Sequence, residues 1–202
     1  MSADFIYLAS ASPRRRELLQ QIGVPFRVVG ASVDEVPITH EAPDSYVARL
    51  AAAKADAGWE LAQELGQAPV LAADTAVVLG AKILGKPADR LEAEDMLRQL
   101  SGRSHYVLTA VALRTSSGLD ARISRSLVTF RAIDDAEARA YWETGEPVDK
   151  AGAYAVQGRA AVFIKELRGS YSGVMGLPLF ETAQLLAAAG VRPWIRTVGQ
   201  GS

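Results

Sequence analysis

One apolar run constrains the fold more than any other part of the chain. It reads Pro69-Val-Leu-Ala-Ala-Asp74-Thr75-Ala-Val-Val-Leu79 and is the most apolar stretch of the sequence. A continuous run of this kind, without polar alternation, predicts a central strand that is buried on both faces of a sheet. Asp74 interrupts it. Because an unpaired buried carboxylate is costly, this side chain is expected to protonate, pair with a cation or ligate a metal. The alternative is a carboxylate that caps a turn or forms a purely structural ion pair.

A second stretch, residues 5–19, predicts a buried strand that turns directly into a helix. Pro13 suits the first helical position, and Ser12 is expected to cap the helix through its side chain. Three arginines follow, although cations oppose the dipole at a helix N-terminus. A bound anion would resolve this conflict, since helix amides and guanidinium groups both favour phosphate. The alternative is a solvated basic first turn.

A long alanine-rich helix is expected over residues 44–65. Lys54 falls inside its apolar stripe, so its ammonium group must either extend along the surface to water or meet an anion. The positions of the stripe are Val47, Leu50, Ala51, Ala57 and Leu61.

The remaining pattern is that of an α/β protein. Strands are expected at residues 25–29, 82–84, 105–113, 123–132 and 160–167, and helices at residues 15–22, 91–100, 134–144 and 179–189. The strands at 105–113 and 123–132 are expected to form an antiparallel pair on an otherwise parallel sheet. One domain is expected over residues 1–195, followed by a flexible tail at 196–202.

Composition excludes several functional classes. The net charge of −1 gives no general case for binding nucleic acid or acidic membranes, and the absence of cysteine excludes disulfides and fits a reducing cytoplasm. No apolar run reaches membrane-spanning length. The glycine-rich phosphate motifs and zinc-ligand spacings are also missing, and His105 is expected to be an ordinary strand histidine.

What remains is a set of cations at the ends of elements and a set of acids. The cations are Arg14, Arg15, Lys54 and Lys86, and the acids are Glu35 and Asp74. Cations and helix amides can hold a polyphosphate, while acids can bind a divalent ion or deprotonate a water molecule. Sequence spacing alone does not show that these groups meet.

In residue identity and order, these motifs resemble those of the Maf family of nucleoside triphosphate pyrophosphatases. The matching blocks are Leu8-Ala-Ser10-Ala-Ser12-Pro13-Arg14-Arg15, Asp34-Glu35, Ala48-Arg49-Leu50 with Lys54, Ala73-Asp74-Thr75, Gly85-Lys86-Pro87, Leu100-Ser-Gly102, Asp149-Lys150-Ala-Gly152-Ala-Tyr154 with Gln157-Gly158, and Gly176-Leu-Pro178-Leu. They cover nearly the whole chain. The motifs Ala-Asp-Thr and Gly-Ala-Tyr-Ala-Val-Gln are similar to those of the branch of the family that acts on dTTP and UTP.

The resemblance implies hydrolysis between the α and β phosphates, which gives a nucleoside monophosphate and pyrophosphate. By this resemblance, Asp74 is the proton acceptor, and Lys54, Lys86 and Glu35 are the other catalytic residues. Glu35 and Asp74 would hold Mg²⁺ or Mn²⁺. Ser10, Arg14, Arg15, Lys54 and Lys86 would hold the phosphates, and Arg14, Thr75 and Gln157 would select the base. It also implies a Maf/ITPase-like fold, in which an extended mixed sheet has helices on both sides and two lobes surround a deep nucleotide groove. Homodimers are common in the family.

Three other functions are weighed beside this one. The first is the sister activity on 7-methyl-GTP. The second is a non-catalytic nucleotide-binding regulator of cell division, against which the intact set of Glu35, Asp74 and Lys86 argues. The third is an RNA-binding domain, which the balanced charge and the lack of interleaved aromatic and basic residues disfavour.

Overall fold

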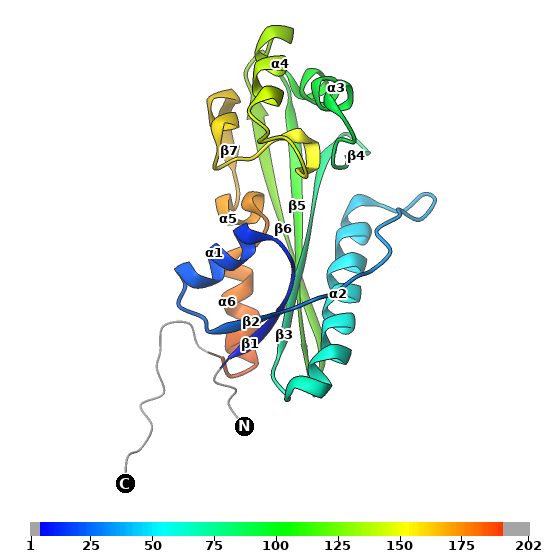
Figure 1. Ribbon diagram of the computed structural model, residues 1–202, viewed down its shortest axis with the longest axis vertical. Coiled ribbons are helices and arrows are strands. Elements are labelled where there is room, and N and C mark those ends of the chain that lie inside the picture. Colours follow the sequence, from blue (N-terminus) through cyan, green and yellow to red (C-terminus); the bar gives the residue numbers. More distant parts are fainter. Residues whose placement is uncertain (1–4, 192–202) are drawn as a thin grey trace.

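The computed structural model describes residues 5–191 (Figure 1). The predicted boundary at residue 195 and the predicted tail at 196–202 lie outside these residues. Along the chain the elements are β1 (Ile6–Ala9), α1 (Pro13–Gln21), β2 (Phe26–Val29), α2 (Pro43–Leu65), β3 (Val70–Leu79), β4 (Lys82–Leu84), α3 (Arg90–Leu100), β5 (Ser104–Thr115), β6 (Gly118–Phe130), α4 (Asp135–Glu143), the 3-10 helices η1 (Ala151–Ala153) and η2 (Arg159–Phe163), β7 (Ile164–Arg168), α5 (Tyr171–Met175) and α6 (Leu179–Ala188).

The strands form one mixed sheet in the order β2-β1-β3-β5-β6-β7, with β4 paired to β3. β1 runs parallel to both β2 and β3, whereas β3, β5, β6 and β7 are successively antiparallel. Eight of the ten residues of β3 are buried, which confirms that it is a central strand. The predicted α/β architecture with an extended mixed sheet is therefore confirmed, as is the antiparallel pairing of β5 with β6. The expectation that the rest of the sheet is parallel is wrong, because β3 pairs antiparallel with β4 and β5, and β6 pairs antiparallel with β7.

One edge of β3 is left open in its middle, and this opening positions the site. β1 pairs with β3 only as far as Leu71, and β4 joins the same strand only from Val77 onward. Among the described strands, only β5 pairs with residues 72–76. Asp74 lies in this interval, opposite Ala110 of β5. The strand that most constrains the fold thus carries its carboxylate into a break in the sheet.

Helices cover both faces of the sheet, as predicted (Figure 1). In β1, Tyr7 packs into the cluster that α2 covers, whereas Ile6 and Leu8 pack into the cluster formed with α1 and α6. This alternation follows the two-residue period of a strand. A third cluster packs α3 and α4 against one end of β3, β5 and β6. This part of the molecule, at the top of Figure 1, is called the upper lobe. None of the helices within residues 5–191 is both long and apolar enough to cross a membrane.

The long helix α2 lies closer to the sheet than a leucine-rich helix could. A Cβ atom added to Gly58 would come within 2.7 Å of the Cβ of Ala9 and within 2.9 Å of a Val70 methyl group. The apolar stripe therefore does not continue to Leu61 as predicted. Leu61 is exposed, and the helix packs instead through Ala55, Gly58 and Ala62.

The strand predicted at residues 160–167 is also only partly correct. Its first half is the 3-10 helix η2, and the chain joins the sheet edge only from Ile164 onward.

Candidate functional site

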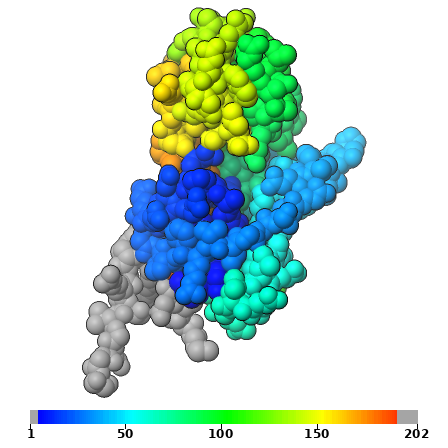
Figure 2. Space-filling model, in the orientation of Figure 1, coloured from blue at the N-terminus to red at the C-terminus, as the bar shows by residue number. Residues whose placement is uncertain are grey.

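A pocket of about 710 Å³ lies beside the open edge of β3, lined also by the start of α1, by α2 and by the segment near residue 150. Figure 2 shows the N-terminal segment (blue) reaching up to the segment near residue 150 (yellow) on this face. Eight of the nine predicted site residues line the pocket, namely Ser10, Arg14, Arg15, Glu35, Lys54, Asp74, Thr75 and Lys86. Gln157 is exposed and is not one of the lining residues.

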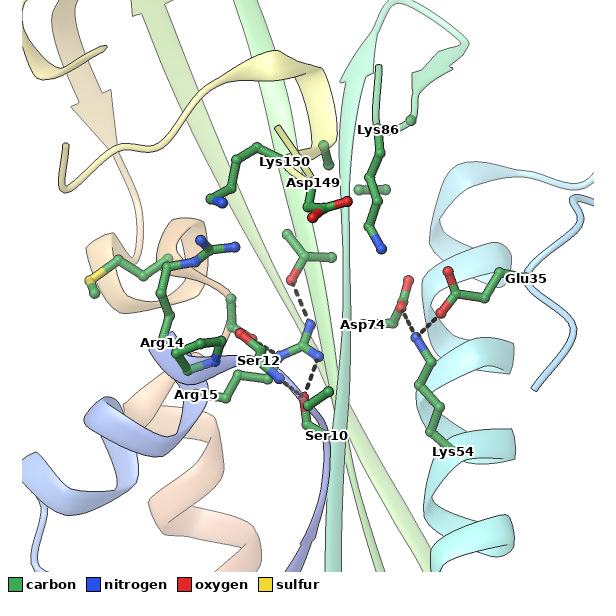
Figure 3. Close-up of a pocket in the computed structure, with 18 of the residues that line it drawn as sticks. Ser10, Ser12, Arg14, Arg15, Glu35, Lys54, Asp74, Lys86, Asp149 and Lys150 are labelled. Carbon is green, nitrogen blue, oxygen red and sulfur yellow. Dashed lines mark hydrogen bonds and ion pairs between the residues drawn. The ribbon is translucent and has the colours of Figure 1, made fainter. Parts of the chain in front are cut away.

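Lys54 bridges the two predicted acids (Figure 3). Its Nζ atom lies 2.7 Å from Oδ1 of Asp74 and 2.6 Å from Oε1 of Glu35. The side chain of Asp74 is 10% exposed and that of Lys54 is 12% exposed, whereas that of Glu35 is 49% exposed. Lys54 therefore points into the pocket and does not extend along the surface to water. The buried carboxylate of Asp74 is thus paired with the Lys54 ammonium, as its burial requires.

The surroundings move the pKa values of the two acids in opposite directions. Burial raises the pKa of Asp74 above its ordinary value, even though Lys54 and Arg15 act to lower it. The hydrogen bond from Lys54 lowers the pKa of Glu35, with burial opposing it. Two neighbouring acids with divergent pKa values are typical of a division of labour, in which one acid takes a proton and the other stays ionised.

Arg15 is fixed by three hydrogen bonds and is not a solvated side chain. Its Nε donates to the carbonyl oxygen of Gly176 at 2.8 Å, Nη1 to Oγ of Ser10 at 3.1 Å, and Nη2 to Oγ1 of Thr75 at 3.4 Å. The three acceptors belong to three separate parts of the chain. The guanidinium group is therefore held in one orientation at the pocket wall.

The hydroxyl protons around Arg15 have definite directions. Ser10 Oγ accepts from Arg15 and from the amide of Ser12, so its own proton is free for a ligand. Thr109 donates its only hydroxyl proton to the Gly173 carbonyl oxygen at 2.7 Å. In the 3.0 Å contact between Thr75 and Thr109, Thr75 is then the donor, and its lone pairs are left to accept from Arg15.

The start of α1 differs from the prediction in one respect. Ser12 is the N-cap residue and Pro13 the first helical residue, but the Ser12 side chain makes no capping hydrogen bond. The first-turn amides consequently have no side-chain cap beside the pocket that Arg14 and Arg15 also line. Burial lowers the pKa of both arginines below its ordinary value. Open amides and partly desolvated guanidinium groups favour an anion here.

Sequence reasoning assigned no role to several groups of this site. Asp149 and Lys150 line the pocket from the glycine-rich connection after α4, and Tyr46 lines it from the first turn of α2. The pair Asp149-Lys150 lies within a block that resembles the family, which is the signal that could have identified it. Thr109 lies on β5, opposite Thr75 of β3, and carries no such signal.

His105 lies apart from the pocket. It is 1% exposed, and its Nε2 lies 2.8 Å from the hydroxyl of Tyr154 in the core of the upper lobe. Burial lowers the pKa of His105 to about 4, so the ring is neutral at physiological pH. The prediction of a structural histidine is consistent with this placement.

One oxygen of Glu35 and one of Asp74 contact the Lys54 ammonium at 2.6 and 2.7 Å, so Lys54 occupies the point at which these two oxygens converge. The second oxygen of each carboxylate is left to reach Mg²⁺ or Mn²⁺, which usually takes one or two carboxylates together with phosphates of a substrate. Within residues 5–191 no group of three or more His, Cys, Asp or Glu residues forms a metal site by itself. The donors therefore fit a metal that arrives with an anionic ligand.

Comparison with known proteins identifies the family of the chain. The family model described as Maf-like protein matches residues 5–189. A protein of Aromatoleum aromaticum named dTTP/UTP pyrophosphatase is 56% identical over 196 residues, covering 92% of this chain and 95% of that protein. A protein of Nitrosospira multiformis with the same name is 53% identical over 197 residues, covering 93% and 95%. A solved structure from Mycobacterium abscessus, described as nucleoside-triphosphatase / dITP/XTP pyrophosphatase, is 19% identical with a TM-score of 0.44, covering 91% and 96%. The chain belongs to the Maf family.

Proposed function

We propose that this protein is a nucleoside triphosphate pyrophosphatase that hydrolyses dTTP and UTP to the nucleoside monophosphate and pyrophosphate. One observation carries the proposal. Asp74 is a buried carboxylate with a raised pKa, held by Lys54 at the open edge of β3 in a pocket rich in cations. The names of the relatives supply the substrate, since proteins 53–56% identical to this chain are named dTTP/UTP pyrophosphatase.

Asp74 is proposed to accept the proton of the attacking water. The water oxygen forms a new bond to phosphorus, the proton passes to Oδ of Asp74, and the bridge between the α and β phosphates breaks as pyrophosphate leaves. The raised pKa of Asp74 makes it a stronger base than an exposed aspartate. Lys54 fixes the carboxylate in place and keeps enough of it ionised to act, since its charge lowers the pKa of Asp74.

Glu35 and Asp74 would hold the divalent cation, and that ion would neutralise phosphate charge. The lowered pKa of Glu35 keeps this carboxylate ionised at neutral pH.

The phosphates are proposed to lie against the uncapped start of α1. Ser10 has a free hydroxyl proton for them, and the fixed guanidinium of Arg15 and the ammonium groups of Lys54 and Lys86 line the same pocket. Arg14 and Thr75, which line the pocket, are proposed to select the base together with Gln157, which lies outside the lining and is added on the resemblance to the family alone. Because Thr75 accepts from Arg15, its side chain connects the phosphate-binding wall to base selection.

We further propose a cytoplasmic enzyme that forms homodimers and does not act on nucleic acid. The net charge of −1 and the absence of cysteine support this placement.

A panel of nucleoside triphosphates tests the proposal. With Mg²⁺ or Mn²⁺, pyrophosphate release should be fastest for dTTP and UTP and slow for GTP and 7-methyl-GTP. Preference for 7-methyl-GTP would assign the chain to the sister activity, and binding without turnover would assign it to the regulatory class. Gln157→Glu should weaken the preference for UTP over 7-methyl-GTP, and an unchanged preference would contradict its role in selection.

A further inference from the structure

Two cations on one side of the pocket form no ion pair with a carboxylate within the described residues. Arg14 comes from α1 and Lys150 from the connection after α4, and both line the pocket. Figure 3 shows the Arg14 guanidinium beside the Lys150 ammonium, across the pocket from Lys54 and Glu35. The side chain of Lys150 donates from Nζ to the carbonyl oxygen of Val148, at 3.1 Å.

The segment that carries Lys150 is held firmly on both sides. On its N-terminal side, Glu146 accepts hydrogen bonds from the Tyr141 hydroxyl at 2.7 Å and from the amides of Arg159 and Ala160 at 2.9 and 3.3 Å. A single carboxylate thus ties α4 to η2 and closes the connection into a loop. The position of Lys150 is therefore a property of the folded loop.

On the C-terminal side, Gly152 fixes the loop against β3. Its amide donates to the Gly85 carbonyl oxygen at 2.9 Å, and a Cβ atom there would lie 2.8 Å from Val77. Asp149 has a φ of 60°, in the left-handed region that aspartate adopts more readily than most residues with a side chain.

The position is electrostatically unfavourable for the protein alone. Burial lowers the pKa of Lys150, and Arg14 lowers it further, with a smaller contribution from Lys86. Asp149 and Glu146 oppose this effect without cancelling it. A bound anion would remove the repulsion between the two cations, because each would then face an opposite charge.

The net charge of the pocket lining also favours a bound anion. Its lining has five basic residues, Arg14, Arg15, Lys54, Lys86 and Lys150, and three acidic ones, Glu35, Asp74 and Asp149. The surplus of two positive charges matches the two negative charges of a nucleoside triphosphate bound to one divalent cation. Without Lys150 the surplus would be one.

We propose that Lys150 and Arg14 form an anion subsite for the terminal phosphates of the substrate and for the pyrophosphate that leaves. The inference rests on the proposed function, which puts the scissile bond next to Asp74. Lys54 holds Asp74 and Glu35 on that side of the pocket, and Lys150 on the opposite wall is a further cation, not engaged with Asp74, that can meet the departing phosphates. Because Arg14 is also proposed to contact the base, the test varies Lys150.

The two reaction products serve as probes, since neither is turned over. Isothermal titration calorimetry of the full-length protein with pyrophosphate and with UMP should show that Lys150→Gln weakens pyrophosphate binding by about tenfold or more, as expected for a lost charge-assisted contact, and leaves UMP binding within about twofold. Lys150→Arg should keep pyrophosphate affinity, which controls for folding of the loop. Lys165→Gln, at an exposed position of β7, should change neither affinity.

Two results would overturn the subsite. The first is unchanged pyrophosphate affinity in Lys150→Gln, which would make Lys150 a solvated side chain. The second is an equal or larger loss of UMP affinity, which would put Lys150 at the base or the α-phosphate. If the wild-type protein hydrolyses UTP and binds both products, either result removes only this inference. A wild-type protein that releases no pyrophosphate from UTP or dTTP removes the proposed function itself.

Discussion

The Nζ atom of Lys54 lies 2.7 Å from Oδ1 of Asp74, and this contact joins the long helix α2 to the central strand β3 at the break in the sheet. Both side chains are nearly excluded from solvent, yet the pKa of Asp74 is raised, because burial outweighs the attraction of Lys54. Folding therefore places a carboxylate where it is costly for stability and useful as a base. The predictions below follow from this balance.

The two pocket acids should affect stability at pH 7 in opposite directions. The folded pKa of Asp74 is raised, so its contribution to stability is present below its unfolded pKa and is lost as the pH rises through the folded value. The folded pKa of Glu35 is lowered, so its contribution is present above its unfolded pKa and is lost as the pH falls through the folded value. At pH 7, thermal unfolding should show a higher Tm for Asp74→Asn and a lower Tm for Glu35→Gln. A lower Tm for Asp74→Asn would contradict the assigned cost of burial.

Removing Lys54 should move the pH dependence of turnover. Lys54 lowers the pKa of Asp74, so in Lys54→Met that pKa rises further and the base is protonated over a wider range. The acidic limb of kcat against pH, measured with UTP, should shift to higher pH, and kcat itself should fall. Lys165→Met, at the exposed position on β7, serves as the matched control and should leave the limb in place. A shift to lower pH would mean that Asp74 is not the titrating base.

Thr109 should matter for catalysis although it is fully buried and does not line the pocket. Thr109→Val removes the acceptor that takes the Thr75 proton, so Thr75 no longer presents only lone pairs to Arg15. It also removes one of the two donors to the Gly173 carbonyl, which keeps the amide of Gly176. We expect kcat/KM for UTP to fall about tenfold and the free energy of unfolding to fall by about 1–3 kcal/mol, the usual cost of an unsatisfied buried group. Thr109→Ser keeps the hydroxyl and should restore kcat/KM. Lost stability with unchanged kcat/KM would show that Thr109 has a structural role only.

Gly152 should be far less tolerant of substitution than another glycine of similar backbone conformation. Gly152 and Gly80 have φ values of 68° and 63°, but a Cβ atom at Gly152 would meet Val77 at 2.8 Å, whereas at Gly80 it would meet nothing within 4 Å. Urea unfolding should give a loss of about 1–2 kcal/mol for Gly80→Ala from backbone strain alone. Gly152→Ala should lose at least about 1 kcal/mol more through overpacking. Equal losses would show that the loop carrying Lys150 is not held against β3.

The parts of the site that could be predicted from sequence are residues whose charge is unfavourable within their own strand or helix. Asp74 stands in an apolar strand, Lys54 falls on the buried side of a helix, and Arg15 opposes a helix dipole. Each conflict requires a partner and can be seen locally. The structure resolves the first two with one ion pair and the third with hydrogen bonds to Ser10, Thr75 and Gly176.

Features that depend on contacts between distant segments could not be predicted in this way. Thr109 looks like any strand threonine until pairing of β3 with β5 places it opposite Thr75. Likewise, helical periodicity favours Leu61 for the buried face of α2, whereas the close approach of that helix to Ala9 and Val70 requires Gly58. The misassigned residues 160–163 form η2 because Glu146 binds the amide of Ala160, a contact between segments that local β-propensity does not include.

Product analysis by ³¹P nuclear magnetic resonance tests the central claim most directly. Wild-type protein incubated with UTP and Mg²⁺ should give UMP and pyrophosphate in equal amounts. Asp74→Asn should give the same products at least about a hundredfold more slowly, because the proton acceptor is gone while the shape of the pocket remains. Formation of UDP and orthophosphate by the wild type, or a wild-type rate in Asp74→Asn, would contradict the account.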